Sequence, residues 1–143
     1  MDVEYRTAKK EELEQLISQI REGKFEPLNP LESKSVHQDL QNLKTKDYLV
    51  AVEKKKILGF ARFKKISEDR THIGIFSIKK EHRLKGVGKR LLEHIEKKIN
   101  TPNLTVGTYS SRSVDWFKKR GFKIRAEKCL HPELKVSLLE KRL

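Results

Sequence analysis

Residues 71–99 decide the fold and read THIGIFSIKKEHRLKGVGKRLLEHIEKKI. The part that ends at Ile78 favours a strand. A basic turn that contains two glycines comes next. It leads into a segment whose apolar residues recur at helical spacing, namely Val87, Leu91, Leu92, Ile95 and Ile99. This order of strand, turn and amphipathic helix is typical of α/β proteins.

The turn at residues 83–90, RLKGVGKR, carries chemistry that suits a pyrophosphate. A helix N-terminus offers backbone N–H groups without intrahelical partners and a partial positive charge. Glycine lacks the Cβ atom that would keep a phosphate away from those groups. No Gly-Lys-Ser/Thr follows, so the turn is not a Walker loop, and its glycine spacing differs from the dinucleotide-binding fingerprint. The alternative interpretation is a flexible loop that only caps the helix.

Outward from this stretch, the pattern predicts the element order β-α-α-β-β-β-α-β-α-β-β. Apolar spacing predicts a helix over residues 13–20, Ser33 is expected to cap a second helix, and a further helix is expected at about 112–120. The expected strands cover residues 3–7, 48–52, 57–63, 71–78, a segment that begins at 104, 122–130 and 134–139. The sequence therefore predicts an α/β protein with a mixed sheet covered by helices.

Length and charge bound the class of protein. The chain has 143 residues, which is typical of one domain, and we expect a single domain over residues 1–143. Its 33 Lys and Arg residues exceed its 20 Asp and Glu residues and give a net charge of +13. That charge suggests a polyanionic partner such as nucleic acid, a phosphorylated cofactor or an acidic protein. A densely solvated Lys/Glu-rich surface is the alternative explanation.

Cysteine usage and hydropathy bound the compartment. Cys129 is the only cysteine, which excludes an intrachain disulfide and a cysteine-cluster metal site. No set of histidines and carboxylates has metal-ligand spacing, so we predict no metal. The apolar runs are too short to span a membrane, and the first residues lack the shape of a signal peptide. We therefore expect a cytoplasmic protein with no membrane partner.

Three segments carry a resemblance to a known family. Arg83-x-x-Gly86-x-Gly88 resembles the acyl-CoA motif Gln/Arg-x-x-Gly-x-Gly/Ala of the GNAT superfamily of N-acyltransferases. Residues 59–61, Gly-Phe-Ala, resemble the third strand of that family. Residues 110–122 resemble its second motif, Asn-x-x-Ala-x-x-Phe-Tyr-x-x-x-Gly-Phe. The resemblance implies a GNAT-like α/β fold with a mixed, mostly antiparallel sheet of six to seven strands flanked by about four helices.

The resemblance also implies acetyl-CoA as acyl donor and assigns residues to it. The 83–90 loop would hold the pyrophosphate, with contributions from Arg83, Leu84, Lys85, Gly86, Val87, Gly88, Lys89 and Arg90. The strand end at Phe76, Ser77 and Ile78 would pair with the pantetheine arm, and a backbone N–H near Ile78 would polarise the acyl carbonyl. The second motif would add Ser110, Ser113 and Phe117 to the cofactor-binding residues.

Proton transfer has candidates that depart from the family pattern. An alkyl amine arrives protonated, so something must accept its proton. We favour His72, which lies at the offset of the catalytic glutamate in histone-acetylating members; the alternative is a half-buried strand histidine with a structural partner. In the family a tyrosine of the second motif often donates a proton to the leaving thiolate, but this sequence has Phe117 at that position. Tyr109 is the candidate substitute donor. The alternative interpretation is that Tyr109 is a strand-end aromatic residue that packs on the surface.

The leading functional hypothesis is an N-acetyltransferase that moves an acetyl group from acetyl-CoA to a primary amine by direct attack. The acceptor is a small molecule or a peptide or protein amine, with polyamines disfavoured by the net charge. One alternative is a non-catalytic acyl-CoA sensor, because Phe117 has no proton to give. A less favoured one is a nucleic-acid-binding protein, based on the charge and on the aromatic pair Trp116-Phe117. We expect a monomer or a homodimer.

Overall fold

The computed structural model describes residues 2–26, 28, 30–42, 44–83, 85–131 and 134–143. The expected order of elements is confirmed, with one added 3₁₀ turn at Lys80–His82 before the third α-helix. The helices are α1 (Lys10–Arg21), α2 (Pro30–Gln41), α3 (Val87–Lys98) and α4 (Ser111–Lys118). The strands are β1 (Glu4–Thr7), β2 (Tyr48–Glu53), β3 (Lys56–Ser67), β4 (Arg70–Ile78), β5 (Asn103–Thr108), β6 (Lys123–His131) and β7 (Leu134–Arg142).

The strands form one mixed sheet in the order β1-β2-β3-β4-β5-β7-β6. Strand β4 pairs with β5 in parallel, whereas β1 with β2, β2 with β3, β5 with β7 and β6 with β7 pair antiparallel. The parallel pairing covers residues 70–73 of β4 and 103–106 of β5. The predicted fold, an α/β protein with a mixed, mostly antiparallel sheet of six to seven strands and about four helices, is confirmed, since the described residues form seven strands and four α-helices.

The chain forms two compact units, each described separately below. Residues 1–63 and 75–98 make up the first unit, and residues 64–74 and 99–143 make up the second. Strands β3 and β4 therefore contribute residues to both units.

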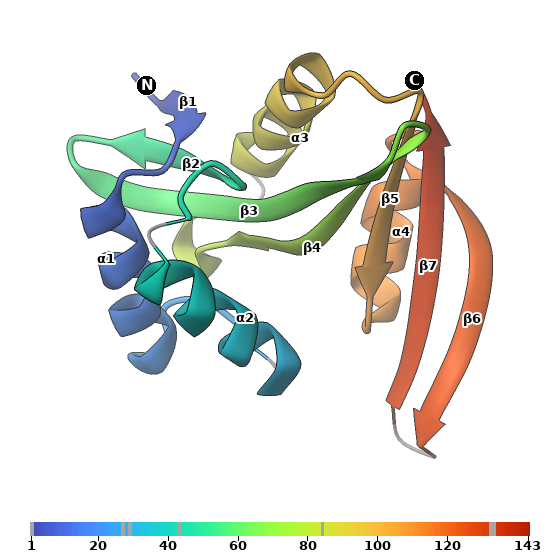
Figure 1. Ribbon diagram of the computed structural model, residues 1–143, viewed down its shortest axis with the longest axis horizontal. Coiled ribbons are helices and arrows are strands. Elements are labelled where there is room, and N and C mark those ends of the chain that lie inside the picture. Colours follow the sequence, from blue (N-terminus) through green and yellow to red (C-terminus); the bar gives the residue numbers. More distant parts are fainter. Residues whose placement is uncertain (1, 27, 29, 43, 84, 132–133) are drawn as a thin grey trace. The chain divides into compact units, whose positions relative to one another are not determined.

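In the first unit, helices cover both faces of β2 and β3 (Figure 1). Helices α1 and α2 pack on one face, where the buried residues include Leu13, Leu16, Val50 and Phe60. Helix α3 packs on the other face, where its Val87 forms a buried cluster with Ala51 and Leu58 of the strands. Alternate strand residues face opposite sides, so each strand supplies side chains to both clusters.

The boundaries of α1 and α2 follow from single residues. Gly23 adopts a φ of 77°, a left-handed conformation that suits a residue just after a helix, and α1 ends at Arg21 as expected. The prediction that Ser33 caps the second helix is wrong, because α2 begins at Pro30 and Ser33 lies inside it. Proline suits the first helical position, since its fixed φ is helical and its missing N–H has no intrahelical acceptor there.

A buried polar cluster joins α2 to β2 and β3. Asp39 is 6% exposed, and its Oδ2 accepts a hydrogen bond from the Tyr48 hydroxyl at 2.8 Å and from Arg62 Nε at 2.6 Å. Burial and the nearby Asp39 carboxylate raise the pKa of Tyr48 well above its ordinary value. The Tyr48 hydroxyl therefore stays protonated and donates a hydrogen bond to the Asp39 carboxylate.

We expect Asp39→Ala to lower the free energy of unfolding by about 2–3 kcal/mol, because it leaves a buried hydroxyl and a guanidinium without their acceptor. Urea denaturation measures this loss. Tyr48→Phe is the control and should cost only about 1 kcal/mol, since the Asp39–Arg62 pair survives. Equal stability of the Asp39→Ala variant and the parent would show that the cluster does not stabilise α2.

In the second unit, α4 lies behind β5 and β7 (Figure 1). Leu104, Val106 and Leu139 are buried between the elements of this unit, together with Phe117 and Phe122. Strands β6 and β7 form a long hairpin in which β6 is the edge strand. Cys129 is exposed on β6.

Candidate active site

The turn between β4 and α3 places one bare glycine at the start of a helix. Gly86 has a φ of 83°, and a Cβ built on it would meet no heavy atom within 4 Å among the described residues. The backbone N–H of Arg90 donates to the Gly86 carbonyl at 3.1 Å, which starts the helical hydrogen-bond pattern. The N–H groups of the residues between these two therefore precede that pattern and can face a ligand. Leu84 lies outside the described residues.

The residues around Gly86 fit a diphosphate group. Val87 is 1% exposed and anchors the first turn of α3 in the core, whereas Lys85, Gly86, Lys89 and Arg90 are exposed. Gly88 lies in the first turn of α3 and is half-buried. Positive side chains thus surround a fixed helix N-terminus that has open space in front of Gly86, which is the arrangement that anions prefer.

Arg83 of the same turn is engaged by a carboxylate. Its Nη2 donates to Glu26 Oε1 at 2.9 Å, and the pair is partly exposed. An exposed ion pair of this kind contributes about 0–1 kcal/mol. A bound phosphate can therefore displace Glu26 from Arg83 at low cost.

The end of β4 contains a buried hydroxyl without a partner. Phe76, Ser77 and Ile78 are half-buried, and Ser77 Oγ has no hydrogen-bond partner among the described residues although it is shielded from solvent. A Cβ on Gly59 would collide with Ile78 Cδ1 and lie 3.1 Å from the Ser77 carbonyl oxygen. A larger residue at position 59 would therefore require the Ile78 side chain to move and the adjoining backbone of β4 to shift slightly.

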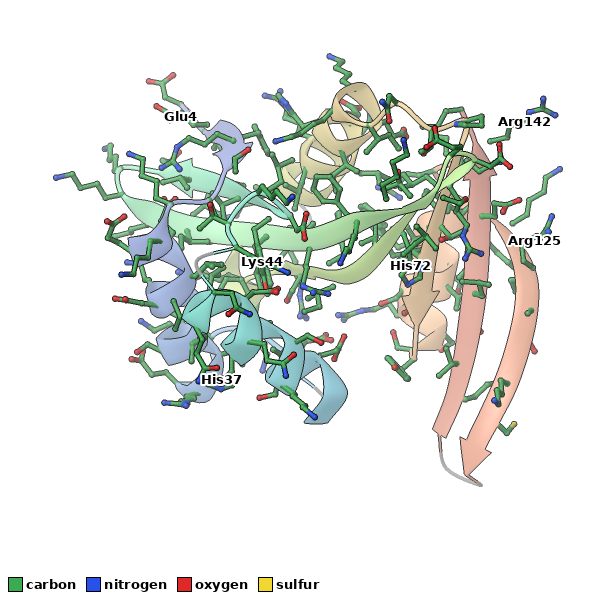
Figure 2. The ribbon with its side chains drawn as sticks, viewed as in Figure 1. Glu4, His37, Lys44, His72, Arg125 and Arg142 are labelled. Atoms are coloured by element: carbon green, nitrogen blue, oxygen red, sulfur yellow. The ribbon has the colours of Figure 1, made fainter. Side chains whose placement is uncertain are left out.

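In the second unit, His72 is held by a hydroxyl on the neighbouring strand. The parallel register sets His72 opposite Thr105, and His72 Nδ1 lies 2.8 Å from Thr105 Oγ1. Figure 2 shows the His72 side chain beside β5. Thr105 Oγ1 also makes a long contact of 3.5 Å as donor to the Thr71 carbonyl oxygen. Because a hydroxyl has one proton, donation to the Thr71 carbonyl leaves Thr105 Oγ1 to accept a hydrogen bond from Nδ1–H, and a neutral imidazole of this tautomer has its lone pair on Nε2.

The surroundings of His72 keep its imidazole neutral. Burial is the main cause that lowers the pKa of His72 below 6.5, and the positive charge of Arg70 lowers it further. Thr105 is 1% exposed, so its contact with His72 is shielded from solvent. A neutral, oriented imidazole with its lone pair on Nε2 can accept a proton near neutral pH.

The predicted residues of the β5–α4 segment divide into two groups. Ser110 caps α4, since its Oγ accepts the Ser113 N–H at 3.1 Å. Tyr109 is 46% exposed and lines, with Ser110, a cavity of about 170 Å³ beside the β6–β7 hairpin. Phe117, in contrast, is 4% exposed and packs edge-to-face on Trp116 and Phe122. Its side chain belongs to the packing of α4 and is not among the described residues that line this cavity.

The residues that the sequence predicted for the site are distributed between the two units. The 83–90 turn and the end of β4 belong to the first, and His72, Tyr109, Ser110, Ser113 and Phe117 belong to the second. Thr105 and Arg70 were not predicted from the sequence. Arg70 could have been found, because it lies two positions before His72 in the expected strand and so points to the same face. The position of Thr105 beside His72 could not, because it depends on the register between β4 and β5.

A family model described as an acetyltransferase (GNAT) domain matches residues 8–134. The chain belongs to the GNAT acetyltransferase family. The match begins before α1 and ends at the start of β7, so it covers the 83–90 turn, His72 and the β5–α4 segment. The predicted family is therefore confirmed.

Solved structures share the GNAT fold over most or all of the chain. Ard1 from Thermoplasma volcanium is 16% identical with a TM-score of 0.80, over 100% of this chain and 99% of that one. The PaiA N-acetyltransferase from Thermoplasma acidophilum, solved in complex with coenzyme A, is 21% identical with a TM-score of 0.70 over 100% of both chains. A GNAT family acetyltransferase from Elizabethkingia anophelis, solved with acetyl-CoA bound, is 17% identical with a TM-score of 0.66, over 80% of this chain and 85% of that one. No curated protein matches the sequence.

The described residues show neither a cluster of metal ligands nor a membrane-spanning helix. In the part of the chain that the structure describes, no three His, Cys, Asp or Glu side chains gather as metal ligands would. None of the described helices combines the length and the apolar character that crossing a bilayer requires.

Proposed function

We propose that this GNAT protein transfers an acetyl group from acetyl-CoA to a primary amine by direct attack. Family membership supports acetyl transfer in general. The observation that carries the proposal for this chain is the bare Gly86 at the N-terminus of α3, ringed by exposed basic side chains. Two structural neighbours that hold coenzyme A or acetyl-CoA are consistent with it.

The first unit supplies the donor-binding residues in this proposal. Backbone N–H groups at the start of α3 bind the pyrophosphate, and Arg83, Lys85, Lys89 and Arg90 balance its charge. The end of β4, residues 76–78, binds the pantetheine arm, and the unpartnered Ser77 Oγ is available to hydrogen-bond a polar ligand. A backbone N–H near Ile78 polarises the acyl carbonyl. Bound acetyl-CoA supplies an activated thioester.

The second unit supplies the proton acceptor. His72 Nε2 is the proposed acceptor of the proton that the acceptor ammonium loses, so that the amine nitrogen has a lone pair for attack. Because six residues of extended strand, about 20 Å, separate His72 from Ile78, this proton travels through intervening water. The C–N bond to the carbonyl carbon forms as the C–S bond breaks, and the sulfur leaves with the electron pair as thiolate. The nitrogen of the new amide loses its second proton to solvent. Tyr109, which is exposed, or solvent returns a proton to that sulfur. Ser110 and Ser113 are proposed to contact the pantetheine arm.

The test is acceptor-dependent release of coenzyme A. Purified full-length chain is mixed with acetyl-CoA and a panel of amines and peptides, and free thiol is followed over time. We expect release that requires an acceptor. Tight binding of acetyl-CoA without release for any acceptor would instead support a sensor, the second candidate, which is favoured by Phe117 at the usual tyrosine position.

Thr105 is predicted to act through His72. We expect Thr105→Val to lower kcat roughly 10-fold, because the imidazole loses the partner that sets its tautomer and orientation. Thr105→Ser, which keeps the hydroxyl, should recover most of the loss. Acetyl-CoA affinity, measured by calorimetry, should stay unchanged in both variants. If Thr105→Ser is as impaired as Thr105→Val, the hydroxyl does not position His72.

Other features of the proposal rest on the sequence. We propose that residues 1–143 form one domain, since the family match runs through both units. The single cysteine supports a reducing compartment, most simply the cytoplasm. The choice between a monomer and a homodimer stays a prediction.

A further inference from the structure

We propose that Lys79 is a self-acetylation site, whose side-chain amine accepts the acetyl group of acetyl-CoA bound at the end of β4. This inference rests on the proposed donor site and adds an acceptor within the chain itself. The juxtaposition that carries it is a buried lysine without a carboxylate partner, one residue after Ile78. Lys79, Ile78 and the turn that is proposed to hold the pyrophosphate all belong to the first unit.

The side chain of Lys79 is buried without the partners that a buried lysine normally has. Lys79 is 6% exposed, and lysine is almost never buried so far unless it is paired. Among the described residues its Nζ forms no hydrogen bond and no ion pair. Unlike Ser77 Oγ, this Nζ is not fully shielded from solvent, so small groups can reach it. An unpaired ammonium is costly to bury, and the position therefore favours a neutral side chain.

Only a weak contact holds the end of the Lys79 side chain. Its Nζ lies 5.7 Å from the centroid of the Phe25 ring, near the limit of about 6 Å for cation–π attraction. The backbone is fixed instead, since the Lys79 N–H donates to the Leu58 carbonyl at 2.9 Å and keeps Lys79 bonded to β3 beyond the end of β4. A fixed backbone with a flexible four-carbon stem allows Nζ to leave the ring and turn toward a group bound nearby.

Lys79 directly follows the residue whose N–H is proposed to polarise the acyl carbonyl. Consecutive Cα atoms are about 3.8 Å apart, so an acyl group at the Ile78 N–H lies within reach of the Lys79 stem. Alternation places the Ser77 side chain on the same face as Lys79. Ser77 Oγ has no partner among the described residues and is therefore available to hydrogen-bond the amide that forms at Nζ.

The surroundings of Lys79 increase the fraction of its amine that is neutral. Burial is the main cause that lowers the pKa of Lys79 below its ordinary value, and the positive charges of Lys24 and Lys56 lower it further. Glu81 and Glu22 act in the opposite direction, but the net shift of this pKa is downward. The neutral amine is the form that attacks a thioester, so more of Lys79 is reactive at neutral pH than of a lysine with the ordinary pKa.

The transfer to Lys79 balances without a further reactant. The ammonium first loses one proton to solvent, and the lone pair on Nζ then attacks the carbonyl carbon of the thioester. A bond forms between Nζ and this carbon as the carbon–sulfur bond breaks, and the sulfur keeps the electron pair. The nitrogen loses a second proton to solvent, and solvent returns one proton to the sulfur. The products are an acetylated lysine at position 79 and free coenzyme A.

The experiment follows isotope-labelled acetyl groups by peptide mass spectrometry. Purified full-length chain is incubated with labelled acetyl-CoA without an amine acceptor, and labelling of Lys79 is compared with labelling of Lys80, its exposed neighbour. We expect Lys79 to be labelled at least about 10-fold faster, because the bound donor holds its acetyl group beside Nζ. Acetic anhydride, which acts from solvent, should instead favour Lys80. A Lys79 that is already fully acetylated after purification, beside an unmodified Lys80, would also support the inference.

Controls show whether the acetyl group comes from the bound donor. Excess desulfo-coenzyme A, which has no thiol, should compete for the donor site and suppress labelling of Lys79, and Gly86→Glu should suppress it by weakening donor binding. Lys79→Arg, which keeps the positive charge, should lose this label alone. Lys80→Arg is the matched control and should leave labelling of Lys79 unchanged. Labelling of Lys79 that is no faster than that of Lys80, or that persists in excess desulfo-coenzyme A, would overturn the inference.

Self-acetylation and transfer to free amines can fail independently of each other. Self-acetylation releases at most one coenzyme A per chain, whereas the proposed transfer releases it repeatedly and only with an acceptor. Labelled Lys79 without acceptor-dependent turnover would support the inference and contradict the proposed function. Turnover with an unlabelled Lys79 would support the proposed function and overturn the inference.

Discussion

Gly86→Glu is expected to raise the Kd for acetyl-CoA by on the order of 10²–10³-fold. The new carboxylate would stand at the helix N-terminus, in the open space in front of Gly86 where the pyrophosphate is proposed to bind. Two like charges about 4 Å apart near a protein surface repel by about 4 kcal/mol, and each 1.4 kcal/mol is about tenfold in affinity. Isothermal titration calorimetry with acetyl-CoA measures the change.

The chain offers a matched control in Gly23→Glu. Gly23 also has a left-handed backbone, with a φ of 77°, and it too has no heavy atom within 4 Å of a built Cβ. Both variants therefore carry the same backbone strain and the same change of charge, but Gly23 lies after α1. Gly23→Glu should bind acetyl-CoA like the parent. Parent-like affinity in Gly86→Glu would remove the pyrophosphate assignment from this turn.

His72→Ala is expected to lower kcat by roughly 10²–10⁴-fold, the range that a positioned general base contributes. The Kd for acetyl-CoA should not change, since the proposed donor contacts lie elsewhere. Turnover kinetics and calorimetry on the same preparation separate the two effects. His94→Ala is the control, because His94 is an exposed histidine on α3 that stacks on Tyr5. An equally impaired His94→Ala, or a fully active His72→Ala, would contradict the base role.

The pH dependence of activity should reflect the protonation of His72. His72 accepts a proton only when its imidazole is neutral, and burial together with Arg70 lowers its pKa below 6.5. Activity of the parent should therefore be retained at pH 6.5 and fall only as the pH drops through the lowered pKa. His72→Ala should lose this acid limb. The lowered pKa of His72 also affects the free energy of unfolding, because the unfolded chain binds a proton at this histidine more readily than the folded protein does. The stability present above pH 6.5 is therefore lost as the pH falls from 6.5 through the folded-state pKa.

Local patterns in the sequence predicted most of the fold. The strand, glycine turn and helix of residues 71–99 follow from alternation, apolar spacing and Gly86, and all three elements form where expected. The start of α2 was predicted wrongly because a serine cap and a first-turn proline give competing signals within a few residues, and Pro30 prevailed. These features depend on short-range geometry, which a sequence displays directly.

The contacts that shape the candidate site are long-range and were not predictable in the same way. The bond between His72 and Thr105 depends on the parallel register of β4 and β5, which no local pattern specifies. The pairing of Arg83 with Glu26 likewise joins residues far apart in the chain. The sequence shows that Phe117 departs from the family motif. It does not show that Phe117 is buried against Trp116 and Phe122, because that burial depends on how α4 packs.

The division of β3 and β4 between the two units constrains any attempt to dissect the protein. Each unit consists of two separate stretches of chain, and the stretches interleave along the sequence. No contiguous fragment contains one whole unit without residues of the other, since residues 1–98, which include the whole first unit, also carry residues 64–74 of the second. N- or C-terminal fragments should therefore expose unpaired strand edges and aggregate, and the intact chain is the smallest piece suited to expression and refolding.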